Sequence, residues 1–359
     1  MVTEKNSLLW CRIACLAGTA AALYLVFHRL NLHALGQALR TMRPGWFLAA
    51  LVLYGLLFLP AAWRWHIVLR LMKLSAGIGA TARLTLIGHF FYTVFFGVAG
   101  GDAAKAVLYA RWHRKPLPDL LATAPLDRLL GLAGLIGFAA MAFLIAGITG
   151  GFEGVKWISM KSPGGWALAA LAAALIIFWL IRRSAPTSGQ RRFVRALSHG
   201  AKVLAASPRL AAQGMLCGWL VQLALSGVLA LNLRAVTHEP LPWEQMLWTF
   251  PLIVVMSGLP ISVAGLGTRD GAAMALWGLY AVSAPDAVAA SLLTVMVGLF
   301  WAFAGAILFW RERRLQDALL PAPKTDSSSV LIRTFRNFNR PFDFARVADV
   351  PETRVRPEQ

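Results

Sequence analysis

Two pairs of charged residues interrupt strongly apolar sequence, and each pair stands just after a run of glycines. Asp102 and Lys105 follow the segment FYTVFFGVAGG, and Arg269 and Asp270 follow TFPLIVVMSGLPISVAGLGT. Residues three apart share one face of a helix, so Asp102 and Lys105 can form an ion pair. A helix start offers unsatisfied N–H groups and the positive end of the dipole, which favour an anion such as a phosphate. The chemistry that these residues predict is anion binding.

Each pair also has a structural explanation. A carboxylate in the first turn of a helix complements the helix dipole, which would account for Asp102 and Asp270 without any ligand. A third pair, Asp127 and Arg128, stands at the start of another apolar run. That pair is either an ion pair at the membrane interface or a gate beside the segment that carries Asp102.

The composition indicates a membrane protein. Of the 359 residues 58% are hydrophobic and 14% are charged, the mean hydropathy is +0.62, and several nearly uncharged runs have the length that crosses a bilayer. The formal net charge of +19 comes from basic residues that flank these runs. Such flanking is typical of the positive-inside bias and of contact with anionic lipids, so we expect membrane lipids as partners and no nucleic acid.

The sequence predicts six complete membrane spans and two broken segments, and these elements must position the charged residues. Gly weakens a helix and Pro removes a hydrogen bond, so both broken segments must leave the helical conformation. Irregular backbone at membrane depth is tolerated only where protein or a polar cavity surrounds it, which makes the breaks candidate sites. The predicted breaks are at Gly97, Gly100, Gly101, Gly258, Pro260, Gly265 and Gly267. The predicted spans are 8–27, 45–63, 129–148, 165–181, 212–231 and 287–310.

Lys and Arg set the orientation of the spans. The segment 182–211 holds seven basic residues and no acid, and Arg311, Arg313 and Arg314 follow the last span. Both chain ends are therefore expected in the cytoplasm of a prokaryotic cell, with the protein in the plasma (inner) membrane. One loop disagrees, because Arg29, Arg40 and Arg43 lie where the loop is assigned outside.

Counting the crossings predicts two re-entrant hairpins that enter from opposite faces, at about 84–110 and 247–282. Each half then consists of span, span, hairpin, span, and three crossings invert the second half relative to the first. We expect an all-α polytopic membrane protein with an inverted repeat, an architecture of many secondary transporters. A plain hydropathy count would give seven or eight helices. The predicted divisions are 1–148, 149–310 and a mostly disordered cytoplasmic tail, 311–359.

Few residues favour bond-making chemistry. Cys11, Cys15 and Cys217 lie in apolar spans without ligand spacing, and the seven His residues show no paired spacing. We therefore expect no metal, no cofactor and no catalytic residue, so the chain is not expected to be an enzyme. His89 in the first hairpin either packs helices together or relays protons.

Three motifs resemble a known family, the membrane domain of the bifunctional lysylphosphatidylglycerol synthase/flippase. Residues 259–271, LPISVAGLGTRDG, are similar to its LPxSxGGxGxREG stretch, with Asp270 where the family usually has Glu. Residues 100–105 are similar to its GGDxxR segment, with Lys105 in place of Arg, and Asp127, Arg128 and Gly131 match its DRxxG. The family commonly has Asn and Pro in the first hairpin, where this chain has Tyr92 and Phe96. The family's soluble aminoacyl-transfer domain has no counterpart here, so lysyl transfer is not expected.

The sequence and the resemblance predict a flippase-like transporter that moves a phosphate-bearing lipid, either a phospholipid or a polyprenyl-phosphate carrier, between leaflets. Its expected substrate-binding residues are Asp102, Lys105, Asp127, Arg128, Arg269 and Asp270. The alternative is a non-transporting membrane partner that docks a separate lipid-modifying or glycosyl-transfer enzyme through the basic stretch at 182–207.

Overall fold

The structure is a computed structural model that describes residues 24, 26, 28, 30–74, 77–94, 98–113, 115, 117–152, 202–237, 242–258 and 265–319. Every regular element in these ranges is a helix. The helices are α2 (Leu32–Arg40), α3 (Pro44–Leu56), α4 (Phe58–Leu71), α5 (Ile78–Val94), α6 (Val98–His113), α7 (Leu117–Leu121), α8 (Thr123–Ile148), α11 (Pro208–Val236), α12 (Trp243–Leu247), α13 (Thr249–Gly258), α14 (Thr268–Gly278) and α15 (Ala284–Leu319).

Four stretches of this structure are long and apolar enough to cross a membrane: Pro44–Leu71, Asp119–Ile148, Pro208–Val236 and Ala284–Arg313. They contain the predicted spans 45–63, 129–148, 212–231 and 287–310, so these four predictions are confirmed as long apolar helices. The predicted spans 8–27 and 165–181 fall outside the described residues, apart from isolated positions at the end of the first. Most of the basic stretch at 182–207, on which the docking alternative depends, also falls outside them.

Glycines bring α8 and α11 together along much of their length. A Cβ added to Gly134 of α8 would lie 2.5 Å from the carbonyl carbon of Gly218 on α11, and one added to Gly214 would lie 2.6 Å from Leu130. Such close backbone approach is typical of helix crossings in membranes. Because residue numbers rise in the same direction on both helices from one contact to the next, α8 and α11 are parallel.

The other two long stretches run the opposite way. Leu53 of α3 lies against Gly227 of α11, and the Arg43 guanidinium just before α3 donates to the carbonyl oxygens of Arg234 and Thr237 at the end of α11, both at 2.5 Å. Arg43 thus satisfies the negative end of the α11 dipole. Arg43 therefore has a local structural role, which explains why this arginine lies on a loop that was predicted to be outside the cell. Asn232 of α11 donates to Thr294 of α15 at 2.9 Å, and Val228 of α11 shares a buried cluster with Val297 of α15. An earlier residue of α11 thus lies with a later residue of α15, so these two helices are also antiparallel.

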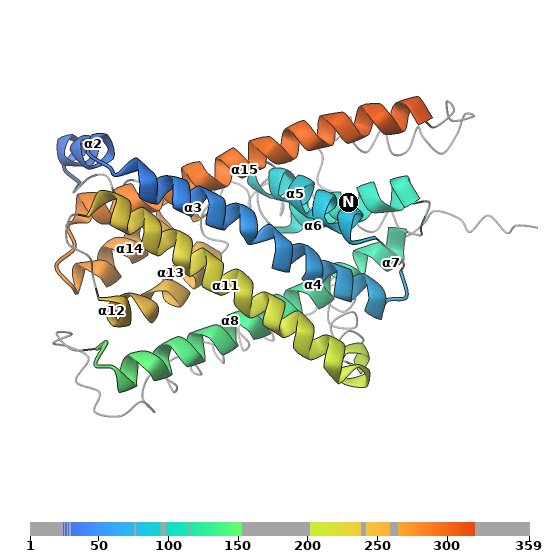
Figure 1. Cartoon of the computed structure of the whole chain (residues 1–359), viewed down its shortest axis with the longest axis horizontal. Coiled ribbons are helices and arrows are strands. Elements are labelled where there is room, and N and C mark those ends of the chain that lie inside the picture. Colours follow the sequence, from blue (N-terminus) through green and yellow to red (C-terminus); the bar gives the residue numbers. More distant parts are fainter. Residues whose placement is uncertain are drawn as a thin grey trace, which may run out of the picture. The chain divides into compact units, whose positions relative to one another are not determined.

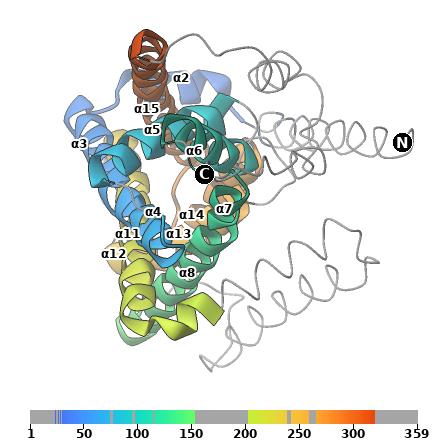
Figure 2. The ribbon, with the colours of Figure 1, turned by 90° about the vertical axis from the view of Figure 1, so that its right-hand side faces the viewer.

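Two helix pairs, α5–α6 and α13–α14, fold back on themselves and pack at opposite ends of the long helices (Figure 1). The α5–α6 pair shares a core with Leu69 near the end of α4 and Leu126 near the start of α8. The α13–α14 pair shares a core with Leu35 of α2, Val236 at the end of α11 and Ala287 at the start of α15. In the view along the helices, α3 and α11 lie on one side and α6 and α7 on the other (Figure 2).

The breaks differ in detail from the prediction. Only residues 95–97, which include Gly97, separate α5 from α6, so Gly100 and Gly101 lie inside the first turns of α6. Gly101 is needed there because a Cβ would lie 2.7 Å from the carbonyl oxygen of Gly88 on α5. In the second pair Gly258 is the last residue of α13, Gly265 and Gly267 have φ of 76° and 80°, and Pro260 falls outside the described residues.

The chain divides into a larger compact unit, Cys15–Phe309, and a second unit composed of Met1–Ala14 and Trp310–Gln359. The described part of the second unit is the end of α15, which continues to Leu319. Residues 311–319, assigned to the tail from the sequence, are therefore helical, since the stretch RERRLQDAL contains good helix formers and no Gly or Pro.

Candidate functional site

The first site begins with the close packing of α5 on α6. A Cβ added to Gly88 would lie 2.7 Å from Cγ of Lys105, so the missing side chain makes room for the lysine stem. Asp102 stands one turn before Lys105, and its Oδ1 lies 3.1 Å from the Lys105 Nζ. The ion pair expected from the three-residue spacing is confirmed, and both side chains are only 11% exposed.

A second ion pair joins α4 to α8. Arg64 donates from Nε to Oδ1 of Asp127 at 2.7 Å and from Nη2 to Oδ2 at 3.1 Å. A Cβ added to Gly131 would lie 2.8 Å from Nη1 of Arg64, so this glycine leaves space for the guanidinium. Two-point contacts between guanidinium and carboxylate are strong and fix the geometry of both groups.

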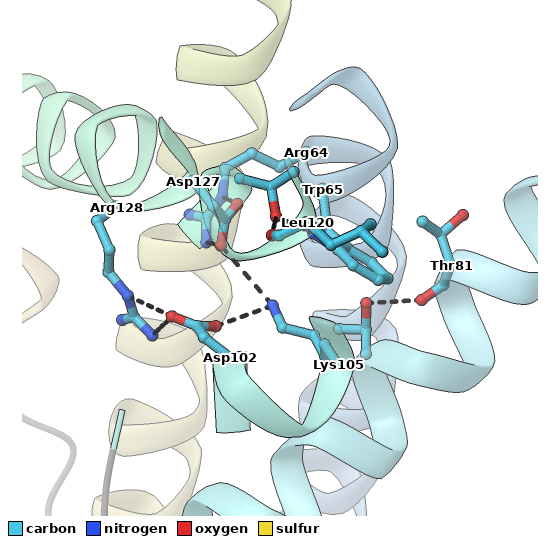
Figure 3. A network of polar contacts seen from close by, with 10 residues as sticks. Arg64, Trp65, Thr81, Asp102, Lys105, Leu120, Asp127 and Arg128 are labelled. Atoms are coloured by element: carbon cyan, nitrogen blue, oxygen red, sulfur yellow. Dashed lines mark hydrogen bonds and ion pairs between the residues drawn. The ribbon is translucent and has the colours of Figure 1, made fainter. Parts of the chain in front are cut away.

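The two pairs are joined into one network (Figure 3). The Lys105 Nζ lies between the two carboxylates, 3.9 Å from Oδ2 of Asp127, and Arg128 donates to Oδ2 of Asp102 from Nε at 2.9 Å and from Nη2 at 2.5 Å. Asp127 and Arg128 therefore both have partners on other helices. The structure brings all four residues predicted for this region into one cluster, which we name the α6–α8 ion network together with Arg64.

The network contains three cations and two carboxylates, and so carries one excess positive charge. Arg64 is 15% exposed and Asp127 5%, whereas Arg128 is 45% exposed. Buried charges are tolerated when they are paired, and those within membrane-spanning helices commonly mark substrate paths. Arg128 is thus the accessible side of a cluster that is otherwise enclosed.

Trp65 covers the network on its α4 side. The Lys105 Nζ lies 5.1 Å from the centre of the Trp65 ring, a distance at which a cation is attracted to the ring face. The indole Nε1 donates to Oγ1 of Thr123 at 3.4 Å, and that hydroxyl donates to the carbonyl oxygen of Leu120 at 2.6 Å. The ring is therefore held between α4 and the start of α8.

The second site is built at the start of α14. Gly267 has a positive φ of 80° at the N-cap, and its N–H donates to Oδ2 of Asp270 at 2.9 Å. Asp270 is fully buried. The structural explanation considered for this carboxylate therefore holds in the structure, since Asp270 caps its own helix and takes up one of the N–H groups at the helix start.

The side chains of Arg269 and Asp270 are linked by hydrogen bonds through a serine of α15. Ser291 accepts from Nε of Arg269 at 2.7 Å and donates to Oδ1 of Asp270 at 2.5 Å. The direct distance from the Arg269 Nη2 to Oδ1 of Asp270 is longer, 3.7 Å. The Nη2 atom is buried and makes no hydrogen bond. The predicted pair is thus present, with a hydroxyl between its members.

His89 connects α5 to α15, since its Nε2 lies 3.0 Å from the carbonyl oxygen of Gly298. Its ring stacks on Tyr92 at 6.0 Å and lies 5.7 Å from the ring of Tyr54. These contacts fit the interpretation of His89 as a helix-packing residue. In the part of the chain that the structure covers, no three His, Cys, Asp or Glu side chains gather as they would around a metal ion.

Sequence reasoning missed Arg64, Trp65 and Ser291. Arg64 served only to assign orientation, and a serine within an apolar span carries no signal of its own. Each becomes recognisable only when a helix distant in sequence is placed beside it.

Comparison with known proteins shows the family of the chain. Residues 11–306 match the family described as Lysylphosphatidylglycerol synthase TM region. A comparison with curated proteins gave no match. The match covers most of the chain and includes both helix pairs and both charged sites, and the long apolar helices fit an integral membrane protein. The chain therefore belongs to the family of the lysylphosphatidylglycerol synthase transmembrane region.

Proposed function

We propose that this protein is a flippase-like transporter that moves a phosphate-bearing lipid, a phospholipid or a polyprenyl-phosphate carrier, between the leaflets of a prokaryotic inner membrane. The proposal includes no enzymatic step and no cofactor. The observation that carries it is the pair of interrupted helix pairs, α5–α6 and α13–α14, which pack at opposite ends of the long helices and each hold a buried ion pair.

The opposite placement supports two re-entrant hairpins in an inverted repeat. The antiparallel course of α3–α4 against α11, and of α11 against α15, agrees with the alternating crossings that the Lys and Arg pattern predicts. In this arrangement both termini lie in the cytoplasm, the α5–α6 pair enters from the cytoplasmic face and the α13–α14 pair from the other. Broken helices that meet from two faces are where secondary transporters bind their substrates.

The charges suit a phosphate. The α6–α8 ion network has one cation more than it has carboxylates, so an added anion would complete its charge balance, with Arg128, which is 45% exposed, on the accessible side. Asp102 holds Lys105 and Arg128 in place until the anion arrives. The acyl or prenyl tail remains in the bilayer against exposed apolar side chains such as Leu132 and Ile136 of α8.

Translocation in vesicles tests the proposal. The purified full chain is reconstituted in phosphatidylcholine vesicles that contain phosphatidylglycerol with a fluorescent acyl chain, and dithionite quenching measures how fast the inner-leaflet probe becomes accessible. We expect the double variant Lys105→Ala, Arg269→Ala to lose most of the protein-dependent rate. The matched control is Arg40→Ala, Arg70→Ala, because both of these arginines are exposed.

An equal rate for the two double variants would remove Lys105 and Arg269 from the mechanism. A rate for the unmodified protein no higher than that of protein-free vesicles would count against translocation of this lipid class.

A further inference from the structure

Arg269 holds an unused donor in the interior of the protein. Five buried side-chain atoms in the described ranges have no hydrogen-bond partner, on His66, Gln222, Ser226, Asn232 and Arg269, and only the Nη2 of Arg269 belongs to a permanently charged group. The Arg269 side chain is 11% exposed. Burying a guanidinium N–H without a hydrogen-bond partner costs free energy. A site that retains such a donor is therefore suited to a ligand that binds reversibly and supplies the acceptor.

Ser291 determines how the guanidinium is turned. Its single hydroxyl proton goes to Oδ1 of Asp270, so its oxygen is left to accept from Nε of Arg269. Asp270 is itself fixed because its other oxygen accepts from the N–H of Gly267. The chain of contacts from Gly267 to Arg269 uses Nε and leaves Nη2 without a hydrogen bond, 3.7 Å from Oδ1 of Asp270.

Two tyrosines from other helices stand near this guanidinium. Tyr54 on α3 and Tyr92 on α5 both contribute to the electrostatic environment of Arg269, and both rings lie beside His89, at 5.7 and 6.0 Å between ring centres. The Tyr54 hydroxyl lies 3.4 Å from the Cβ position of Gly298, two turns after Ser291 on α15. The electrostatic surroundings of Arg269 therefore include hydroxyls from α3 and from α5 of the other helix pair.

We propose that the Arg269 Nη2 and the Tyr54 and Tyr92 hydroxyls form a subsite for one phosphate group, and that Ser291 is the positioning residue that orients Arg269 for it. The subsite rests on the proposed function for its source of phosphate, a lipid headgroup that reaches the start of α14. It is separate from the α6–α8 ion network, whose buried cations Arg64 and Lys105 lie 2.7 and 3.1 Å from carboxylate oxygens, closer than the 3.7 Å between the Arg269 Nη2 and Asp270.

Binding is measured with the full chain in detergent micelles, by thermophoresis, using dioctanoyl phosphatidic acid, dioctanoylglycerol and inorganic phosphate as probes. Loss of a hydrogen bond to a charged group corresponds to roughly tenfold weaker binding. We expect Ser291→Ala and the double variant Tyr54→Phe, Tyr92→Phe each to weaken the binding of phosphatidic acid by about tenfold. The binding of dioctanoylglycerol should not change. Ser291→Thr keeps the hydroxyl and should remain within about twofold. Tyr24→Phe is the matched control, since Tyr24 is 64% exposed.

The results separate the subsite from transport. If the tyrosine double variant and Arg269→Lys bind phosphatidic acid as well as the unmodified chain, the subsite is wrong even if vesicles still show translocation. If binding depends on these residues but no lipid moves in vesicles, the subsite stands and the transport proposal fails. Inorganic phosphate that competes at the affinity of phosphatidic acid would overturn the lipid source and leave a site for free phosphate. The tyrosine variants keep their rings, so they test the subsite even where Ser291→Ala lowers the melting temperature.

Discussion

Arg64 and Asp127, which stand 63 positions apart, face each other through two parallel hydrogen bonds of 2.7 and 3.1 Å. Gly131, one turn after Asp127, leaves the space that the guanidinium occupies. This contact fixes α4 against α8. Since Asp127 is only 5% exposed and also faces Lys105, the contact forms the buried part of the α6–α8 ion network.

Removal of one member of this pair should be much more harmful than replacement of both. Arg64→Met or Asp127→Leu alone leaves a buried charge without its partner, which costs about 3–5 kcal/mol of unfolding free energy. The double variant replaces the pair with apolar groups, and we expect it to be at least about 1 kcal/mol more stable than either single variant. Unfolding in mixed detergent micelles measures all three. A double variant whose loss equals the sum of the two single losses would show that the residues are not coupled.

Gly131→Ala should act through Arg64. The added Cβ would lie 2.8 Å from Nη1, and a free arginine would move aside, but this one is held by Asp127. We expect a loss of about 1–2 kcal/mol of unfolding free energy. The matched control is Gly137→Ala on the same helix, where nothing lies within 4 Å of the new Cβ. In an Arg64→Met background the penalty of Gly131→Ala should disappear, and its persistence would contradict this explanation.

The partners of Asp127 and Arg128 show what the sequence can and cannot predict. Adjacent residues on a helix point about 100° apart, so two neighbouring charges are poorly placed to pair with each other. Each therefore found a partner on another helix, Arg64 for Asp127 and Asp102 for Arg128. The motif was recognisable from the sequence, but the partners depended on which helices pack together.

The same distinction applies to the helices. Four of the predicted spans could be recognised because some 20 apolar residues in a row have few other uses. The first break was predicted too widely, because glycine serves two purposes. Gly101 allows α5 and α6 to approach closely inside a helix, whereas Gly267 supplies a positive φ at a helix start. Composition alone does not separate these uses.

The positive φ of Gly267 gives a prediction about the second site. Gly267→Ala forces an L side chain into the left-handed region, at a cost of about 1–2 kcal/mol, and disturbs the N–H that Asp270 accepts. We expect a lower melting temperature and weaker binding of phosphatidic acid, because Asp270 supports Ser291 and Arg269. Gly278→Ala is the control on the same helix, with open space around its Cβ. Equal melting temperatures for the two variants would contradict the prediction.

Arg128 and Asp102 should separate stability from transport. Arg128 is 45% exposed, so Arg128→Gln is expected to change the unfolding free energy by no more than about 1 kcal/mol. Asp102→Asn leaves Lys105 and Arg128 without their shared carboxylate and should cost about 2–3 kcal/mol. Both variants should slow translocation in vesicles. If Arg128→Gln is as destabilising as Asp102→Asn, Arg128 is a structural residue and not the accessible side of the network.

The opposite placement of the two helix pairs can be tested in intact cells by labelling single cysteines. Gly79 at the start of α5, Gly278 at the end of α14 and Gly45 at the start of α3 all have open space for a side chain, so each can be changed to Cys with little strain. In a background without Cys11, Cys15 and Cys217, a membrane-impermeant maleimide should label Gly278→Cys and Gly45→Cys from outside. Gly79→Cys should react only after the membrane is permeabilised, because α5–α6 packs where α4 ends and α8 begins. If Gly79→Cys and Gly278→Cys react from the same side, the two pairs do not enter from opposite faces, and the inverted repeat on which the transport proposal depends is wrong.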